Sequence, residues 1–67
     1  MDLGDNIANY RKLKGLTQSD LAIVTGVSKG FISAIEEGRK VPRLKTLARI
    51  AECLDVKLEK LLMDDLK

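Results

Sequence analysis

Basic side chains gather in two stretches of the chain, where their charge suits binding to a polyanion. Residues 9–14 carry three cations and no acid, and residues 28–45 carry five cations against two acids. Residues 52–67 carry three cations against five acids. The net charge of +2 is small, so the distribution matters more than the total. We expect such a molecule to present a preferred face to a polyanion such as nucleic acid.

The groups that most enzymes use for catalysis are missing. The chain has no His, and its single Cys53 has no second Cys or His with which to form a disulfide or bind zinc. The acidic pairs Glu36–Glu37 and Asp64–Asp65 are adjacent residues, whose side chains point about 100° apart on a helix and cannot flank one substrate atom. No glycine-rich phosphate loop is present. We therefore expect no enzyme activity, no metal and no cofactor.

Length and hydropathy predict one small domain, spanning 1–67. The chain has 67 residues, and a chain of this size buries only about 60% of its unfolded surface. With Tyr10 and Phe31 as its only aromatic residues, the core must be aliphatic. No run of 18 apolar residues exists, and the acidic start, with Asp2 and Asp5, does not resemble a signal peptide. These features predict a cytoplasmic protein with no membrane contact, in which Cys53 is a small buried hydrophobe.

Residues 17–38 have the pattern of two short helices joined by a tight turn. Thr17 and Asp20 form a capping box, in which each side chain satisfies the other residue's backbone N–H. Gly26 can end the first helix in the left-handed conformation, and Ser28 can cap the second. The small Ala22 allows the two helices to cross closely. The pattern predicts helices over about 18–25 and 28–37.

Apolar residues at helical spacing predict three further helices, at 3–14, from 44 to about 54, and at 57–66. No segment alternates with a period of two, so the fold class is all-α, with five helices in a compact domain. The residues expected to face the core are Leu3, Ile7, Tyr10, Leu13, Leu21, Ala22, Val24, Ile32, Ile35, Leu44, Leu47, Ile50, Ala51 and Leu54.

Six motifs together resemble a known family. They are RKLKGLTQSDLA, the GVS turn, ISAIEEG, the Pro42 loop, LARIAECLDV and LEKLL. From Leu3 to about Leu62 the chain is similar to the helix-turn-helix regulators of the phage Cro and repressor type, also called the XRE family. The resemblance implies a lambda-repressor-like fold and a sequence-specific transcription regulator that binds double-stranded DNA. It also implies a bacterial or phage protein that associates with the nucleoid through DNA.

The resemblance also implies roles for the helix over residues 29–36, which would lie in the major groove. The residues facing the bases would be Ser28, Lys29, Gly30, Phe31, Ser33 and Ala34. Lys29 can donate to guanine, and Ala34 can touch a thymine methyl group. Gly30 offers no side chain, although it would let the backbone approach DNA closely. Phe31 is either part of the core edge or an exposed ring against the DNA.

Other residues match positions that contact the DNA backbone or brace the fold. The resemblance implies phosphate contacts for Gln18, Arg39 and Lys40, and a minor-groove contact for Arg43. Arg11 and Glu36 match the positions of an ion pair that ties the first helix to the third. Glu37 stands where a neutral or basic residue would suit phosphate better, although Arg39 could offset its charge.

The predicted C-terminal helix at 57–66 is a candidate dimer interface. Leu58, Leu62 and Leu66 form one stripe, flanked by Leu61 and Met63. Packing of this stripe on the fourth helix is the alternative. Regulators of this kind bind as dimers to half-sites about 34–36 Å apart, so we expect a homodimer on a (pseudo)palindromic operator.

The type of regulator stays open at this point. Short members of the family include small phage-type repressors, restriction-modification controllers and antitoxins, and no small-molecule ligand domain is evident. A protein-interaction module with weak DNA binding is the alternative, which Gly30 and Glu37 favour. RNA binding has little support, because the chain has few aromatic residues on which bases could stack.

Overall fold

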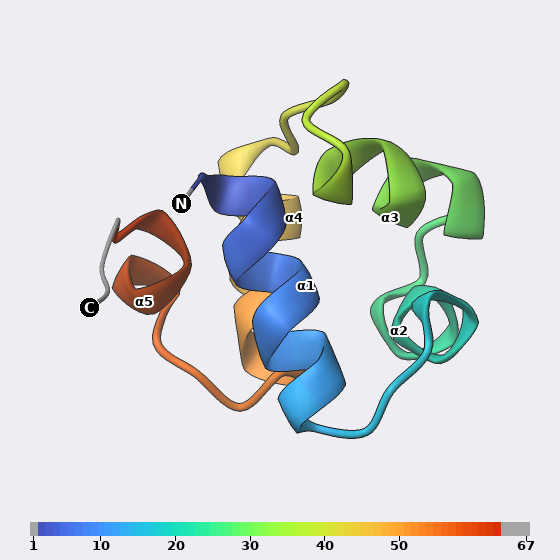
Figure 1. Cartoon of the computed structure of the whole chain (residues 1–67), viewed down its shortest axis with the longest axis horizontal. Coiled ribbons are helices and arrows are strands. Elements are labelled where there is room, and N and C mark those ends of the chain that lie inside the picture. Colours follow the sequence, from blue (N-terminus) through green and yellow to red (C-terminus); the bar gives the residue numbers. More distant parts are fainter. Residues whose placement is uncertain (1, 64–67) are drawn as a thin grey trace.

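The computed structural model describes residues 2–63, which form five α-helices (Figure 1). The helices are α1 (Leu3–Leu13), α2 (Gln18–Thr25), α3 (Lys29–Glu36), α4 (Leu44–Cys53) and α5 (Leu58–Leu62). No strand occurs within this range. The prediction of an all-α fold with five helices is therefore confirmed. Leu66 and the pair Asp64–Asp65 lie outside the described residues.

Packing places α1 between α3 and α5, and α2 between α3 and α4. Helix α5 also contacts α4, on the side of the molecule away from α2 and α3 (Figure 1). The helix-turn-helix pair is thus braced from two directions, by α1 on α3 and by α4 on α2. Within residues 2–63 no helix is both long and apolar enough to cross a membrane.

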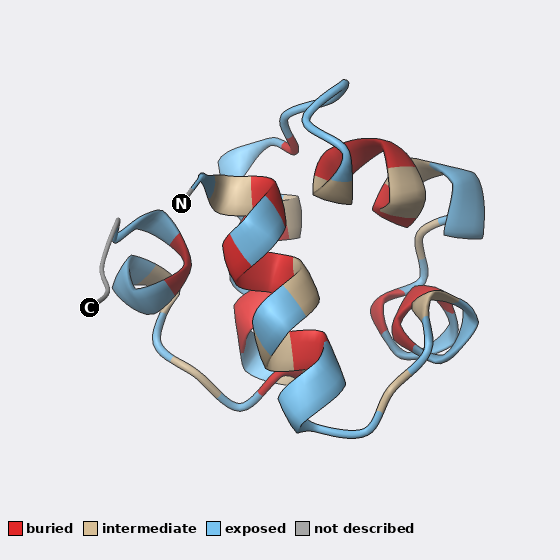
Figure 2. Cartoon of the chain, in the orientation of Figure 1, coloured by how far each residue is buried: buried red, intermediate tan, exposed pale blue. Residues whose placement is uncertain are grey.

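The core is aliphatic and lies where the five helices meet (Figure 2). Its fully buried apolar side chains are Ile7, Leu21, Ile32, Ile35, Ile50 and Leu61. Burying an aliphatic side chain of this size stabilises a fold by about 1.5–3 kcal/mol. Every helix contributes at least one of these residues, so the core joins all five elements.

Three residues predicted to face the core are exposed instead. Leu13 and Leu44 stand at the last position of α1 and the first position of α4, where no neighbouring helix covers them. Val24 is also exposed, because α2 turns Leu21 and Thr25 inward. The buried Thr25 hydroxyl donates to Leu21 O at 2.7 Å, which satisfies its polar group within the helix. These three core predictions were wrong.

Candidate nucleic-acid interface

The start of α2 has the predicted capping box. Asp20 N donates to Thr17 Oγ1 at 2.9 Å, and Thr17 N donates to Asp20 Oδ2 at 3.0 Å. The Thr17 backbone N–H, with help from its hydroxyl, lowers the pKa of Asp20. The stability that the charged capping box gives the fold is therefore present above the ordinary pKa of a carboxyl group. It is lost as the pH falls through the lowered pKa of Asp20.

The turn between α2 and α3 also forms as the sequence predicts. Gly26 has φ +78°, a left-handed conformation that is cheap only without a Cβ, and its N–H donates to Ala22 O at 2.9 Å. Ser28 Oγ accepts from Phe31 N at 3.0 Å and so caps α3. This turn sets the crossing of the two helices.

Helix α4 holds the end of α2 through two contacts that sequence reasoning missed. Arg49 Nη1 donates to Thr25 O at 3.2 Å, and Cys53 Sγ lies 3.5 Å from Val24 O. Arg49 and Cys53 are four residues apart and share one face of α4. This spacing is the sequence signal that could have indicated that both contact the same neighbouring helix. They satisfy consecutive carbonyls in the last turn of α2. Cys53 is half-buried rather than buried.

A nearly buried ion pair joins α1 to α3. Arg11 Nε lies 2.7 Å from Glu36 Oε2, and Arg11 Nη2 lies 3.0 Å from Glu36 Oε1. Their side chains are only 10% and 7% exposed. Arg11 Nη1 also donates to Leu16 O at 2.8 Å, and the hydrogen bond to Glu36 raises the pKa of Arg11. The ion pair implied by the family resemblance is therefore present.

Gln18 extends this ion pair into a network of three side chains. Its Nε2 donates to Glu36 Oε1 at 3.0 Å. The family resemblance implies a phosphate contact for Gln18 and did not indicate this hydrogen bond. Gln18 is the first residue of α2. The network therefore joins the last turn of α1 and the start of α2 to the end of α3.

One side of α3 is buried and the other is open. Ile32 and Ile35 face the core, whereas Lys29 and Gly30 are exposed at the start of the helix. A Cβ built on Gly30 would meet nothing within 4 Å. Phe31 is half-buried and packs against the core with part of its ring accessible. The exposed start of α3 therefore offers Lys29 and open backbone to a ligand.

The prediction that Ala34 faces the groove is wrong. Ala34 is only 4% exposed, and its carbonyl accepts from Arg39 N at 2.8 Å and from Lys40 N at 3.2 Å. These two bonds fold the chain after α3 back over the end of the helix, with Gly38 in the left-handed conformation (φ +80°) that allows the reversal. The same reversal holds Arg39 beside α3.

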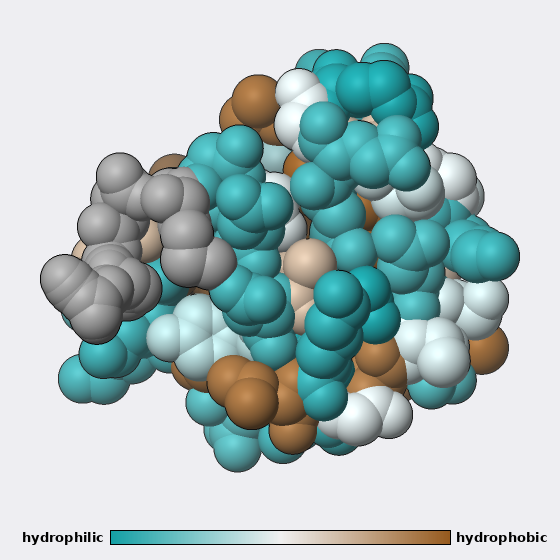
Figure 3. Space-filling model, viewed as in Figure 1, coloured by the Kyte–Doolittle hydropathy of each residue, from teal (hydrophilic) through white to brown (hydrophobic). Residues whose placement is uncertain are grey.

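Exposed cations follow α3 in the loop that leads to α4. Lys40 and Arg43 are exposed, and neither forms an ion pair within residues 2–63. Arg39 Nε lies 2.8 Å from Glu37 Oε1, and Ser33 Oγ donates to Glu37 Oε2 at 3.1 Å. The hydrogen bond from Arg39 lowers the pKa of Glu37. The top of Figure 3, where this loop protrudes, is mostly hydrophilic, with a small hydrophobic patch beside it.

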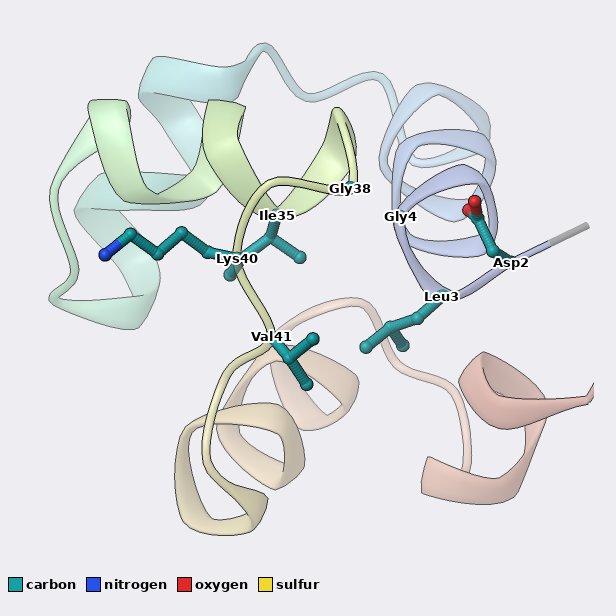
Figure 4. Close-up of a pocket in the computed structure, with 7 residues that line it drawn as sticks. All are labelled: Asp2, Leu3, Gly4, Ile35, Gly38, Lys40 and Val41. Atoms are coloured by element: carbon teal, nitrogen blue, oxygen red, sulfur yellow. The ribbon is translucent and has the colours of Figure 1, made fainter.

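A shallow pocket of about 170 Å³ lies between the start of α1 and this loop (Figure 4). Its lining residues are Asp2, Leu3, Gly4, Ile35, Gly38, Lys40 and Val41. The Lys40 side chain extends away from Leu3 and Val41. This volume is below the range of typical small-molecule sites, so the pocket adds no ligand chemistry to the basic surface.

Comparison with known proteins agrees with this geometry. The sequence pattern of the family described as helix-turn-helix matches residues 7–61. The chain is 40% identical over 65 residues to the ImmF control region 10 kDa protein of Bacillus phage phi105, covering 97% of this chain and 72% of that protein.

Two solved structures show the same fold. The N-terminal DNA-binding domain of SinR from Bacillus subtilis has a TM-score of 0.89 and 35% identity, covering 97% of this chain and 96% of that one. The restriction-modification controller C.AhdI from Aeromonas hydrophila has a TM-score of 0.86 and 27% identity, covering 90% of this chain and 91% of that one. The chain belongs to the helix-turn-helix family of the phage Cro and repressor (XRE) type, and it is a DNA-binding transcription regulator rather than an enzyme.

Proposed function

We propose that this regulator binds a (pseudo)palindromic operator as a homodimer, with α3 of each copy in the major groove of one half-site. The observation that carries the proposal is the two-sided character of α3. Ile32 and Ile35 anchor α3 in the core, while Lys29 and Gly30 are exposed at its start. An α-helix presented in this way fits the width of the major groove.

Base recognition then depends mainly on Lys29. Its ammonium group can donate to guanine O6 or N7. The hydroxyls of Ser28 and Ser33 can bond to bases or phosphate, and Gly30 lets the backbone approach the base edges. The accessible part of Phe31 offers an apolar contact to sugar or methyl groups. Sequence preference therefore rests on few direct contacts and on DNA shape.

Phosphate binding uses the elements on either side of α3. The start of α2, with Gln18, presents backbone N–H groups and the positive end of the helix dipole to an anion. The loop after α3 supplies Arg39 and Lys40 for phosphate, and Arg43 for an adjacent minor groove. This arrangement supports phosphate contacts on both sides of α3.

The dimer contact is proposed to use the outer face of α5. Leu61 is buried and Leu58 is half-buried against the core, so both serve the fold of the monomer. Leu62 and Met63 remain 58% and 50% exposed. Exposed apolar residues beside each other at the end of a docked helix favour an interface with a second copy. Leu66, the other residue of the predicted interface, lies outside the described residues.

The similarity to a phage control-region protein and to a restriction-modification controller supports a regulator of one of these two kinds. On this proposal the protein works in the cytoplasm of a bacterium, bound to DNA at the nucleoid. An antitoxin or a protein-interaction module with weak DNA binding is the alternative that the following test separates.

Selection of duplexes from a random pool, followed by titration at several salt concentrations, tests the proposal. We expect a two-fold symmetric site, and an affinity that falls as the salt concentration rises, with a log–log slope of about −0.9 per neutralised phosphate. A scrambled duplex of the same length is the control. Binding that ignores both salt and sequence would exclude this operator proposal and favour the interaction module.

Lys29 and Lys40 should differ in what they contribute. Changing Lys29→Gln should cut discrimination at one base pair by about 1–3 kcal/mol, because a donor to the base edge is weakened. Changing Lys40→Gln removes the same charge from the loop and should weaken operator and scrambled duplex alike, because phosphate is present in both. Competition titrations on both duplexes measure the difference. Equal loss of discrimination in the two variants would contradict these roles.

Leu62→Asp should prevent dimer formation while leaving the monomer folded, because Leu62 is exposed and a buried carboxylate is costly at an apolar interface. Leu13→Asp is the matched control, since Leu13 is 82% exposed at the end of α1. Sedimentation equilibrium gives the mass of each variant. If Leu62→Asp assembles as the parent does, α5 is not the dimer interface.

A further inference from the structure

Glu37 holds two of the side chains that the proposed function assigns to DNA. Its Oε2 accepts from Ser33 Oγ at 3.1 Å, and its Oε1 accepts from Arg39 Nε at 2.8 Å. Both partners of the ion pair are largely open to solvent, with Arg39 61% and Glu37 56% exposed. A carboxylate therefore occupies the donors that a phosphate would use.

The backbone keeps these groups together on the proposed DNA surface. Lys29, Ser33 and Glu37 follow one another at intervals of four residues, which places them along one side of α3 and its C-cap. The bond from Arg39 N to Ala34 O, at 2.8 Å, holds the start of the loop against the end of the helix. A phosphate that reaches Ser33 or Arg39 must come close to the Glu37 carboxylate.

We propose that Glu37 is an affinity-determining residue. Its carboxylate accepts hydrogen bonds from Ser33 and Arg39 in the free protein, and it repels the DNA phosphate that binds these donors in the complex. The inference rests on the proposed function, because it needs this surface to face DNA. An exposed ion pair is only weakly stabilising, so a phosphate can take Arg39 from Glu37. The carboxylate is then left beside the DNA backbone, where its repulsion is strongest at low salt.

The test is the Glu37→Gln variant, which keeps the length of the side chain and removes its charge. We expect the affinity for operator and scrambled duplex to rise by a similar factor, about three- to tenfold at low salt, with a log–log salt slope steeper by about 1. Glu52→Gln is the matched control, since Glu52 is an exposed acid on α4. It should change affinity by less than twofold, as expected for a distant, screened charge.

A second variant shows whether Arg39 carries the effect. Arg39→Gln should weaken binding more in the Glu37→Gln background than in the parent, because only there is Arg39 free of its carboxylate. If Glu37→Gln binds no tighter than Glu52→Gln while the parent binds with steep salt dependence, the inference is wrong and the proposed function stands. If the parent binds no duplex, both are wrong. Thermal unfolding of each variant confirms that the compared chains are folded.

Discussion

Replacing Glu36 with alanine should lower the free energy of unfolding by about 3–5 kcal/mol, the cost of leaving a buried charge without its partner. The Arg11 guanidinium would keep its bond to Leu16 O and lose both bonds to the carboxylate. Gln18 would lose its acceptor as well. For a domain of this size the loss is a large share of the total stability. Urea unfolding followed by circular dichroism measures it.

A double variant separates the cost of an unpaired charge from the value of the pair. Replacing Arg11 and Glu36 together with leucine removes both charges, and the free energy of unfolding should recover most of the loss. The single variants Arg11→Leu and Glu36→Leu complete a double-mutant cycle, which gives the coupling between the two residues. A Glu36→Ala variant that is as stable as the parent would show that the pair is solvated rather than buried.

Changing Gly4→Ala should destabilise the protein by about 1–3 kcal/mol, the usual cost of forcing extra atoms into a packed site. Gly4 is buried where the start of α1 crosses the end of α3. A Cβ at this position would collide with the carbonyl oxygen of Ile35 and would lie 2.6 Å from that of Glu36. Both obstacles are backbone atoms, which cannot rotate away, so the end of α3 must move.

Gly30→Ala is the matched control, because Gly30 also lies within a helix but has open space around it. Alanine there should raise the free energy of unfolding by about 0.5–1 kcal/mol, since it reduces the entropy that glycine loses on folding. Denaturant unfolding of the two variants should therefore shift in opposite directions. Equal shifts would show that the close crossing of α1 and α3 does not constrain Gly4.

Gly4 and Arg11 act on the same short segment of α3 from one helix. Gly4 allows the backbone of α1 to approach Ile35 and Glu36, and Arg11, about two turns further along α1, holds the Glu36 side chain. Together they set how the end of α3 lies on the core. On the proposed function α3 must present its residues to the major groove at a defined angle, so we expect stability and DNA recognition to depend on the same contacts.

Local chemistry in the sequence was enough to predict the scaffold of the helix-turn-helix. The Thr17–Asp20 box, the left-handed Gly26 and the Ser28 cap depend on atoms within three or four residues, so their spacing alone indicated them. The family resemblance added the Arg11–Glu36 pair, whose partners are 25 residues apart. The five helices were predicted from apolar spacing. The burial predicted for Leu13 and Leu44 was wrong, because no neighbouring helix covers these two ends of α1 and α4.

The surface proposed to face DNA was decided by the tertiary structure. The sequence determined that the chain forms five helices around a capped turn, because caps, turns and apolar periodicity are local properties. It did not determine that Ala34 is covered by the following loop or that Gln18 donates to Glu36. Those outcomes depend on how the backbone folds back and on which side chains then meet, and neither is encoded in the spacing of residues along one helix.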